Sequence, residues 1–228
     1  MKKYDTFLFD ADGTLFDLNR AAANAMKLMF GYCGFNYTED VGEIYIPINS
    51  WAWERFEKGE IDIETLRTIR FERLFDKLGI YHDPKEFNER YLYEIGKSSF
   101  LIDGAEDICR EIVSRGKKIY IVTNGFWATQ ASRIKHSQLS EYISEFFVSE
   151  LIGFQKPHIM YFEHVFSHIP DFDKKSALII GDSLAADIAG GNIAGIDSCW
   201  LNISGGANNM EIVPTYEIKA LNELKRFI

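Results

Sequence analysis

Residues 7–15, with the sequence FLFDADGTL, join a short apolar run to two acidic residues and decide the fold. The run over residues 6–9 predicts a buried strand of a parallel sheet, because such strands are covered on both faces. Ligands of open parallel sheets bind beyond the carboxyl ends of the strands, where Asp10 and Asp12 fall. Two ionised carboxylates this close repel each other unless a cation, a shared proton or full solvation relieves them. A solvated acidic turn, with Gly13 at positive φ, would also fit these residues.

The composition bounds the size of the protein and the class of its partners. The chain has 228 residues, of which 46% are hydrophobic, so a core domain with an insertion is the natural expectation. It has 25 basic against 34 acidic residues, a net charge of −9, and no basic block. We therefore expect neither a nucleic-acid polymer nor a membrane surface as partner. A small anion remains possible where the site itself holds a cation or a lysine.

The cysteines and the first residues indicate the compartment. The three cysteines are widely spaced and form no C-x-x-C pair, which is typical of free thiols in a reducing compartment: Cys33, Cys109 and Cys199. The basic start is followed by acidic residues that interrupt any apolar stretch, so we expect no secretion signal. No apolar run approaches membrane-spanning length. We expect a soluble, cytoplasmic protein that is a monomer or a small homo-oligomer.

Helical periodicity dominates residues 16–97, and no strand signal rises above it there. Residues 44–58 are rich in Trp and Phe, and we expect Pro47 to break this helical stretch. Trp51 and Trp53 could stack on a base or could belong to the core of the insertion. We predict a core domain over 1–15 and 98–228, with an inserted helical domain of about four helices over 16–97.

From residue 100 onward, short apolar runs alternate with helical patterns. Strands are predicted over residues 118–122, 146–149, 177–180, 198–201 and, at an edge, 216–218. Helices are predicted over 104–115, 126–138, 157–168, 185–194 and 220–228, with a polar loop over 202–214. Repeated strand–helix units predict an α/β fold, a three-layer Rossmann-like core with a parallel sheet.

Polar residues gather at or near the predicted carboxyl ends of the strands, which share one edge of a parallel sheet. These residues are Asp10 with Asp12, Thr123 with Asn124 and Gly125, Lys156 with Pro157, and Asp182 with Asp187. One edge would therefore hold several carboxylates, a hydroxyl, an amide and an ammonium group.

Each of these groups has a task in phosphoryl transfer. Clustered carboxylates bind Mg²⁺, which together with Lys156 would neutralise a phosphoryl group. The hydroxyl of Thr123, the amide of Asn124 or backbone N–H groups would bond its oxygens. One carboxylate can attack phosphorus and form an acyl phosphate. A second can protonate the leaving oxygen and later activate water, and Asp10 and Asp12 suit these two roles.

The order of these motifs resembles the haloacid dehalogenase (HAD) superfamily, and the helical insertion resembles its C1 cap. The resemblance implies that Asp10 is the nucleophile and a Mg²⁺ ligand. It implies that Asp12 is the general acid/base and offers its backbone carbonyl to Mg²⁺. An acid at that second position is typical of phosphatase members and is lacking in dehalogenases. The remaining implied roles are Mg²⁺ ligation by Asp182, support by Asp187, and phosphoryl binding by Thr123 and Lys156.

A finer resemblance is to the YjjG-type pyrimidine 5′-nucleotidases. It is carried by residues 121–126, by Lys156-Pro157 and by residues 187–202, which end in CWLN. It implies a Mg²⁺-dependent hydrolase of nucleoside monophosphates that acts through an aspartyl phosphate and binds substrate at Asn124 and Gly125.

Two alternatives stay open from the sequence. One is a HAD phosphatase for another small phosphate, such as a sugar phosphate or phosphoglycolate. The other is a non-enzymatic, receiver-like phospho-acceptor module. Receivers are about half this length, lack the insertion, and have no equivalent of Asp12.

Overall fold

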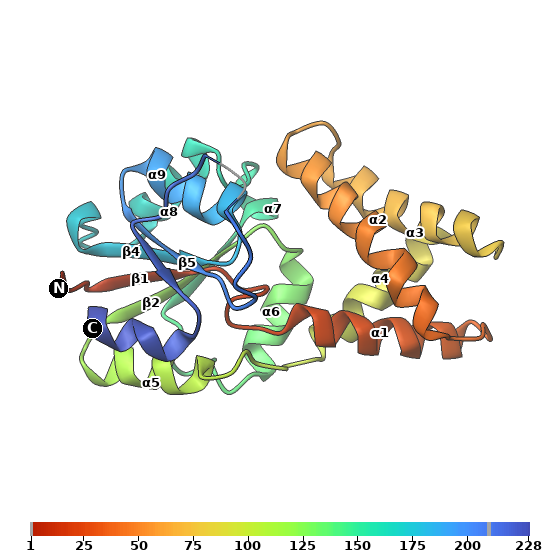
Figure 1. Ribbon diagram of the computed structural model, residues 1–228, viewed down its shortest axis with the longest axis horizontal. Coiled ribbons are helices and arrows are strands. Elements are labelled where there is room, and N and C mark those ends of the chain that lie inside the picture. Colours follow the sequence, from red (N-terminus) through yellow and green to blue (C-terminus); the bar gives the residue numbers. More distant parts are fainter. Residues whose placement is uncertain (1, 209–210) are drawn as a thin grey trace. The chain divides into compact units, whose positions relative to one another are not determined.

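The computed structural model describes residues 2–208 and 211–228 and divides the chain into two compact units (Figure 1). One unit comprises the chain up to Leu18 and from Ser99 onward, and the other comprises Asn19–Ser98. The sequence predicted the boundaries at 15/16 and 97/98, and here they fall at 18/19 and 98/99. Residues 209–210 of the predicted polar loop lie outside the described residues.

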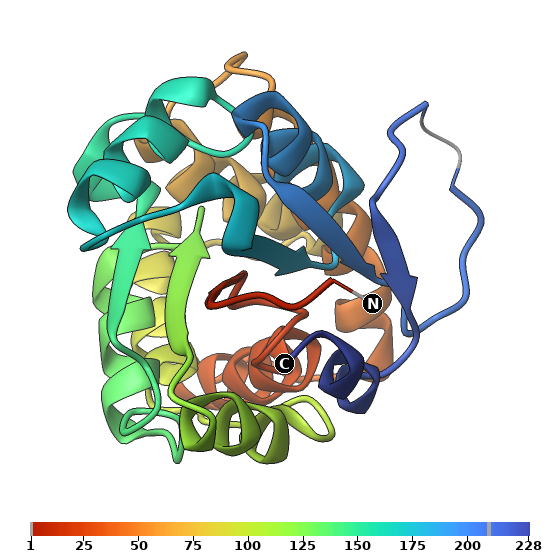
Figure 2. The same cartoon turned by 90° about the vertical axis from the view of Figure 1, so that its left-hand side faces the viewer.

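Along the described chain, six parallel strands of the larger unit form one sheet in the order β3-β2-β1-β4-β5-β6 (Figure 2). Their bounds are β1 Thr6–Phe9, β2 Lys118–Thr123, β3 Glu145–Val148, β4 Ala177–Gly181, β5 Asp197–Leu201 and β6 Tyr216–Ile218. The predicted α/β class is confirmed, with β6 at an edge of the sheet.

The predicted helices of this unit are present with differences at their ends, and the short α7 and η1 were not predicted. Their bounds are α5 Ala105–Ser114, α6 Trp127–His136, α7 Ser149–Ile152, α8 Ile159–His168, η1 Lys174–Ser176, η2 Leu184–Ile188, α9 Ala189–Ala194 and η3 Leu221–Phe227. The helix predicted from Pro157 begins at Ile159, because the ring of His158 accepts the Met160 N–H and caps it. The helix predicted over 185–194 begins as a π-helical turn, η2, and the last helix is of the 3₁₀ type.

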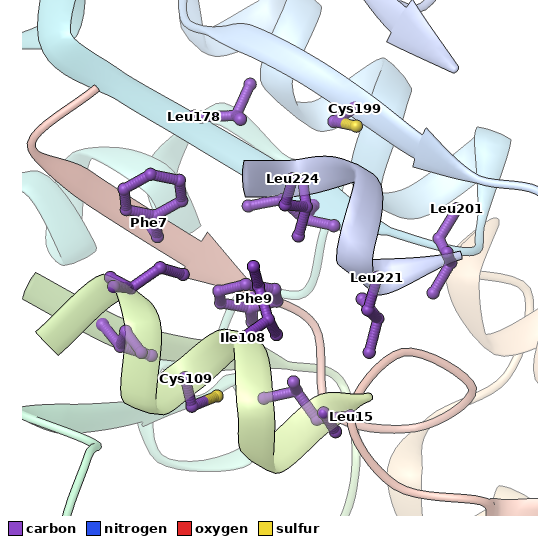
Figure 3. Packing of buried hydrophobic residues seen from close by; sticks show 14 of the residues in the cluster. Phe7, Phe9, Leu15, Ile108, Cys109, Leu178, Cys199, Leu201, Leu221 and Leu224 are labelled. Atoms are coloured by element: carbon purple, nitrogen blue, oxygen red, sulfur yellow. The ribbon is translucent and has the colours of Figure 1, made fainter. Parts of the chain in front are cut away.

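The central strands β1 and β4 are buried over their full length because helices cover both faces of the sheet. Phe7 and Phe9 point to one face, where they lie in a cluster with residues of α5 and η3 (Figure 3). Leu8 points to the other face, where it packs in a cluster with residues of α8 and α9. This side-chain alternation along β1 joins three layers into one core.

The central position of β1 places Asp10 at the middle of the sheet edge. β2 and β4 flank β1, and Phe9 pairs with Ile121 on one side and Ile180 on the other. The chain runs outward from β1 through β2 to β3 and then returns to β4, so the strand order switches beside β1. Ligands of open α/β sheets bind at such a switch point, beyond the carboxyl ends of the strands.

The second unit is helical along its described residues, as the sequence predicted. Its helices are α1 Leu18–Tyr32, which starts at the boundary, α2 Glu39–Glu57, α3 Ile63–Leu78 and α4 Pro84–Gly96. The prediction that Pro47 breaks the second of these was wrong, because α2 runs through it. Proline in a helix costs about 3 kcal/mol. Apolar residues buried on both sides of it, Tyr45 and Ala52 among them, offset this cost by packing.

The chain passes between the two units twice, and the two connecting segments lie side by side within the larger unit. The Asp17 N–H donates to the Phe100 carbonyl at 2.9 Å, and the Ile102 N–H donates to the Leu15 carbonyl at 3.0 Å. Phe16 therefore forms an antiparallel bridge with Leu101. These paired segments, residues 15–17 and 100–102, form a short neck.

None of the helices in the described part of the chain is both long and apolar enough to cross a membrane. The cytoplasmic location and the monomeric or small homo-oligomeric state stay predictions.

Candidate active site

Asp10 lies one residue beyond β1, and the geometry of the sheet fixes its backbone. Its N–H donates to the Ile180 carbonyl at 2.8 Å, which extends the pairing of β1 with β4. The residue is 7% exposed, and its Oδ1 accepts a hydrogen bond from Lys156 Nζ at 2.7 Å. Burial raises the pKa of Asp10 well above its usual range. Lys156 opposes this rise, while Asp187 and Asp182 add to it.

Lys156 is the buried cation of the site, and only 1% of its surface is exposed. Its ammonium group donates to three acceptors, which are Asp10 at 2.7 Å, the Val122 carbonyl at 2.7 Å and Asp187 at 2.6 Å. Burial alone would lower the pKa of Lys156, but the two carboxylates outweigh burial and raise it. The ammonium group therefore stays charged beside Asp10 at neutral pH.

Asn124 holds the Lys156 loop against the end of β2. Its Oδ1 accepts the Lys156 N–H at 2.8 Å, and its Nδ2 donates to the Lys156 carbonyl at 3.0 Å. Thr123 is 1% exposed, and its hydroxyl accepts the Gly125 N–H at 3.0 Å. The structure thus assigns the Asn124 side chain a positioning role. Substrate binding by Asn124 and Gly125 stays a prediction.

Asp182 and Asp187 come from the turn that follows β4. The Asp187 Oδ2 accepts the Ser183 N–H at 3.1 Å and its Oδ1 accepts from Lys156, so the carboxylate braces the π-helical turn η2. The Asp182 carbonyl accepts the indole N–H of Trp200 at 2.9 Å, which ties the turn to β5. Trp200 belongs to the CWLN run, and its structural role there is to hold the turn after β4 against β5.

Gly13 allows the loop after β1 to approach this turn. It has φ +82°, and a Cβ at this position would fall against the Asp182 carboxylate. Desolvation of that carboxylate, followed by the charge of Asp187, raises the pKa of Asp182 to about 7, although the residue as a whole is exposed to solvent.

These residues can hold a hard cation. Asp10, Asp182 and Asp187 each offer an oxygen atom, and these atoms lie within 4.8 Å of one another. Three carboxylates and one ammonium group leave excess negative charge, which adds to the effect of burial in raising the pKa values of Asp10 and Asp182. A divalent cation with oxygen ligands would relieve that repulsion.

Asp12 lies at the same loop but outside this group of three carboxylates. Its Oδ2 accepts a hydrogen bond from Gln130 Nε2 at 2.5 Å, and its Oδ1 pairs with the guanidinium group of Arg133. Sequence reasoning missed both partners. A signal existed, because Gln130, Arg133 and Ile134 share one face of the predicted helix 126–138, and two polar residues beside a core residue are unusual.

The cap aromatic residues are partly buried and already in contact with other side chains. The Trp51 ring lies against two guanidinium groups, with the Arg73 Cζ 3.6 Å and the Arg55 Cζ 4.8 Å from its centroid. Trp53 makes an edge contact with Phe56 at a centroid distance of 5.8 Å. Base stacking by either tryptophan stays a prediction.

Comparison with known proteins identifies the family of the chain. Residues 4–195 match the family model of haloacid dehalogenase-like hydrolases. The chain is 41% identical over 224 residues to YfnB of Bacillus subtilis, named as a HAD hydrolase, covering 98% of this chain and 95% of YfnB. The crystal structure of magnesium-bound YfnB superimposes with a TM-score of 0.93 at 40% identity, covering 99% of this chain and 98% of that one.

Two relatives are named as pyrimidine 5′-nucleotidases. PynA of Streptococcus pneumoniae is 34% identical over 97% of this chain and 93% of its own length. YjjG of Escherichia coli is 30% identical over 99% of this chain and 98% of its own length. The resemblance inferred from the motifs is therefore confirmed, and the chain belongs to the haloacid dehalogenase-like hydrolases.

Proposed function

We propose that this hydrolase is a Mg²⁺-dependent phosphomonoesterase that acts through an aspartyl phosphate on Asp10. The observation that carries the proposal is the pair of carboxylates at one strand end with different partners. Asp10 faces Lys156 within the cluster of carboxylates, whereas Asp12 faces Gln130 and Arg133. Two carboxylates in two environments suit two chemical roles.

The residues present fit Mg²⁺, which prefers oxygen ligands and keeps several waters. We assign its binding to Asp10, Asp182 and the backbone carbonyl of Asp12, with Asp187 in support through Lys156. When bound, the ion neutralises charge on the phosphoryl oxygens. The crystal structure of YfnB bound to magnesium supports a Mg²⁺ site in this family member, without bearing on which residues bind the ion.

The chain's own residues divide the reaction into two steps. The Asp10 carboxylate attacks phosphorus, the ester bond breaks, and the leaving oxygen takes a proton from Asp12. The Asp12 carboxylate then takes a proton from water, whose oxygen attacks phosphorus and releases Asp10 together with phosphate. Thr123 and Lys156 bind the phosphoryl group. Lys156 acts through its charge, because its three N–H donors already serve Asp10, the Val122 carbonyl and Asp187, and its burial keeps solvent screening low.

Stability with and without Mg²⁺ is expected to depend on pH. Asp10 and Asp182 have pKa values above those of an unfolded chain, so the stability they contribute is present at low pH and lost as the pH rises through their folded pKa values, which for Asp182 is about 7. Mg²⁺ binds the ionised carboxylates. We therefore expect it to raise the melting temperature more at about pH 8.5 than at about pH 5.5.

Differential scanning fluorimetry with Mg²⁺ or EDTA at several pH values measures this effect. The Asp182→Asn variant is the control, because it removes a metal ligand and should lose most of the Mg²⁺-dependent shift. An equal shift at both ends of the pH range would contradict the assignment of these carboxylates as ligands.

The substrate class we propose is a pyrimidine nucleoside monophosphate. The two nucleotidase relatives match nearly the whole chain, including the helical unit, at 34% and 30% identity. A small anionic ester also agrees with a protein of net charge −9 whose site holds a lysine and carboxylates suited to a cation.

Phosphate release across a panel of substrates tests the proposal. The panel contains dUMP, dTMP, UMP, AMP, phosphoglycolate and sugar phosphates, each with Mg²⁺ and with EDTA. We expect Mg²⁺-dependent release that is strongest on pyrimidine monophosphates. An Asp10→Asn preparation controls for contaminating phosphatases. A preference for a sugar phosphate would retain the chemistry and overturn the substrate class, whereas no release by the folded protein would overturn the proposed activity.

A further inference from the structure

The side chain of Asp12 is held at two points by α6. Gln130 Nε2 donates to one carboxylate oxygen at 2.5 Å, and the Arg133 guanidinium group pairs with the other. Gln130 is 1% exposed and Arg133 is fully buried, whereas 22% of the Asp12 side chain is exposed. A buried amide and a buried cation therefore meet a carboxylate that still reaches the solvent side of the site. We call Gln130 and Arg133 the α6 clamp.

The fold alone does not account for the α6 clamp. Within the described residues, the Nε and Nη2 atoms of Arg133 and the Oε1 of Gln130 are buried without a hydrogen-bond partner. Burying these polar atoms costs free energy of desolvation, and no hydrogen bond offsets that cost. The guanidinium group also lies over the Phe16 ring at 4.5 Å, where a hydrophobic side chain of similar volume would pack without burying a charge. What the arginine supplies that such a residue could not is its contact with Asp12.

The surroundings of the α6 clamp are shaped to fit it. Gln130 and Arg133 are three residues apart on α6, so both side chains reach the same side of the helix. A Cβ at Gly125 would fall against the amide end of the Gln130 side chain, so a larger residue where the chain leaves β2 would displace that amide from Asp12. The Asp12 backbone is fixed independently, because the Gly13 N–H donates to the Phe16 carbonyl at 2.9 Å. With the backbone fixed, the clamp determines where the carboxylate points.

We propose that Gln130 and Arg133 are positioning residues for Asp12. They hold its carboxylate beside the three carboxylates of the metal cluster, where it can exchange protons with the leaving oxygen and with water. This inference rests on the proposed phosphomonoesterase function. The two residues do not touch the reacting atoms and act only through Asp12.

The test compares Arg133→Met with Arg133→Met in an Asp12→Asn background, on two kinds of ester. An alkyl or nucleoside phosphate needs a proton on its leaving oxygen, whereas p-nitrophenyl phosphate has a leaving group that needs none. General acid/base catalysis contributes roughly 10²–10⁴-fold, so we expect Arg133→Met to lower kcat on the alkyl ester by about 10- to 100-fold. On p-nitrophenyl phosphate we expect a burst of p-nitrophenol, because the aspartyl phosphate still forms while its hydrolysis slows.

The matched control is Lys135→Met, which removes a positive charge from an exposed position of the same helix and should leave both rates unchanged. Arg133→Met should have no further effect once Asp12 is Asn. An equal loss in both backgrounds, or an equal loss on both esters without a burst, would overturn the proposal. A crystal structure of Arg133→Met gives a readout independent of turnover, and an unchanged Asp12 side chain there would also overturn it.

The test is separable from the proposed substrate class. Hydrolysis of p-nitrophenyl phosphate does not depend on recognition of a nucleoside. If the enzyme showed no preference for pyrimidine monophosphates in the panel, the proposed substrate class would be wrong. The rates of the Arg133 variants on p-nitrophenyl phosphate would still test the role of the α6 clamp.

Discussion

Replacing Asp10 by Asn is expected to abolish phosphate release. The amide cannot attack phosphorus and withdraws one negative ligand from the group formed with Asp182 and Asp187. Loss of a covalent nucleophile is expected to lower kcat by at least roughly four orders of magnitude, which is below detection in a standard assay. Phosphate release on the best substrate of the panel, with saturating Mg²⁺, measures this effect.

The fold of Asp10→Asn is expected to survive, which separates chemistry from unfolding. Lys156 keeps its bonds to Asp187 and to the Val122 carbonyl, and the variant relieves repulsion among buried carboxylates. We therefore expect its melting temperature without Mg²⁺ not to fall below that of the wild type. A folded Asp10→Asn enzyme that still turns over would exclude the covalent route.

Replacing Asp12 by Asn is expected to slow turnover of a nucleoside or alkyl phosphate by roughly 10²–10⁴-fold, the range of general acid/base catalysis. The amide can neither give nor take the proton. Asn is preferred to Ala because its Oδ1 can still accept a hydrogen bond from Arg133, and an uncompensated buried guanidinium would be strongly destabilising. Rates on p-nitrophenyl phosphate should fall less in the first step, which stopped-flow release of p-nitrophenol measures.

Asp12→Asn also has a matched comparison in Asp10→Asn. The former should retain slow, Mg²⁺-dependent turnover, and the latter should retain none. If Asp12→Asn hydrolysed an alkyl phosphate at the wild-type rate, Asp12 would have no part in proton transfer.

Much of the fold could be predicted because each strand carries its own signal. The apolar runs, the glycines and the turns at their ends are local features, and β1 to β6 follow from them in order. Pro47 shows where local rules fail. The low helix propensity of proline predicts a break, but the packing of α2 against α3 keeps the helix continuous through it. The start of α8 was placed too early for a local reason instead, because the ring of His158 accepts the Met160 N–H and caps the helix.

The site could be predicted in its list of residues but not in its pairings. Asp10, Asp182 and Asp187 were expected at one sheet edge, and they lie together. Whether Lys156 bonds Asp10, Asp187 or both depends on distances set by three different loops, which no spacing along the chain encodes. Gln130 and Arg133 were missed for the related reason that their partner lies more than a hundred positions earlier in the sequence.

The neck between the units has a consequence for how such an enzyme can be re-engineered. Residues 15–17 and 100–102 are already paired by backbone hydrogen bonds within the sheet-bearing unit, so the ends of the intervening segment are anchored side by side. The conformational entropy lost when a segment is held at both ends grows only slowly with the number of residues in that segment. The helical segment 19–98 could therefore be replaced by a helical segment of another length without changing the register in which β1 pairs with β2. The carboxylate cluster of Asp10, Asp182 and Asp187 would stay intact in such an exchange, because all three residues belong to the sheet-bearing unit.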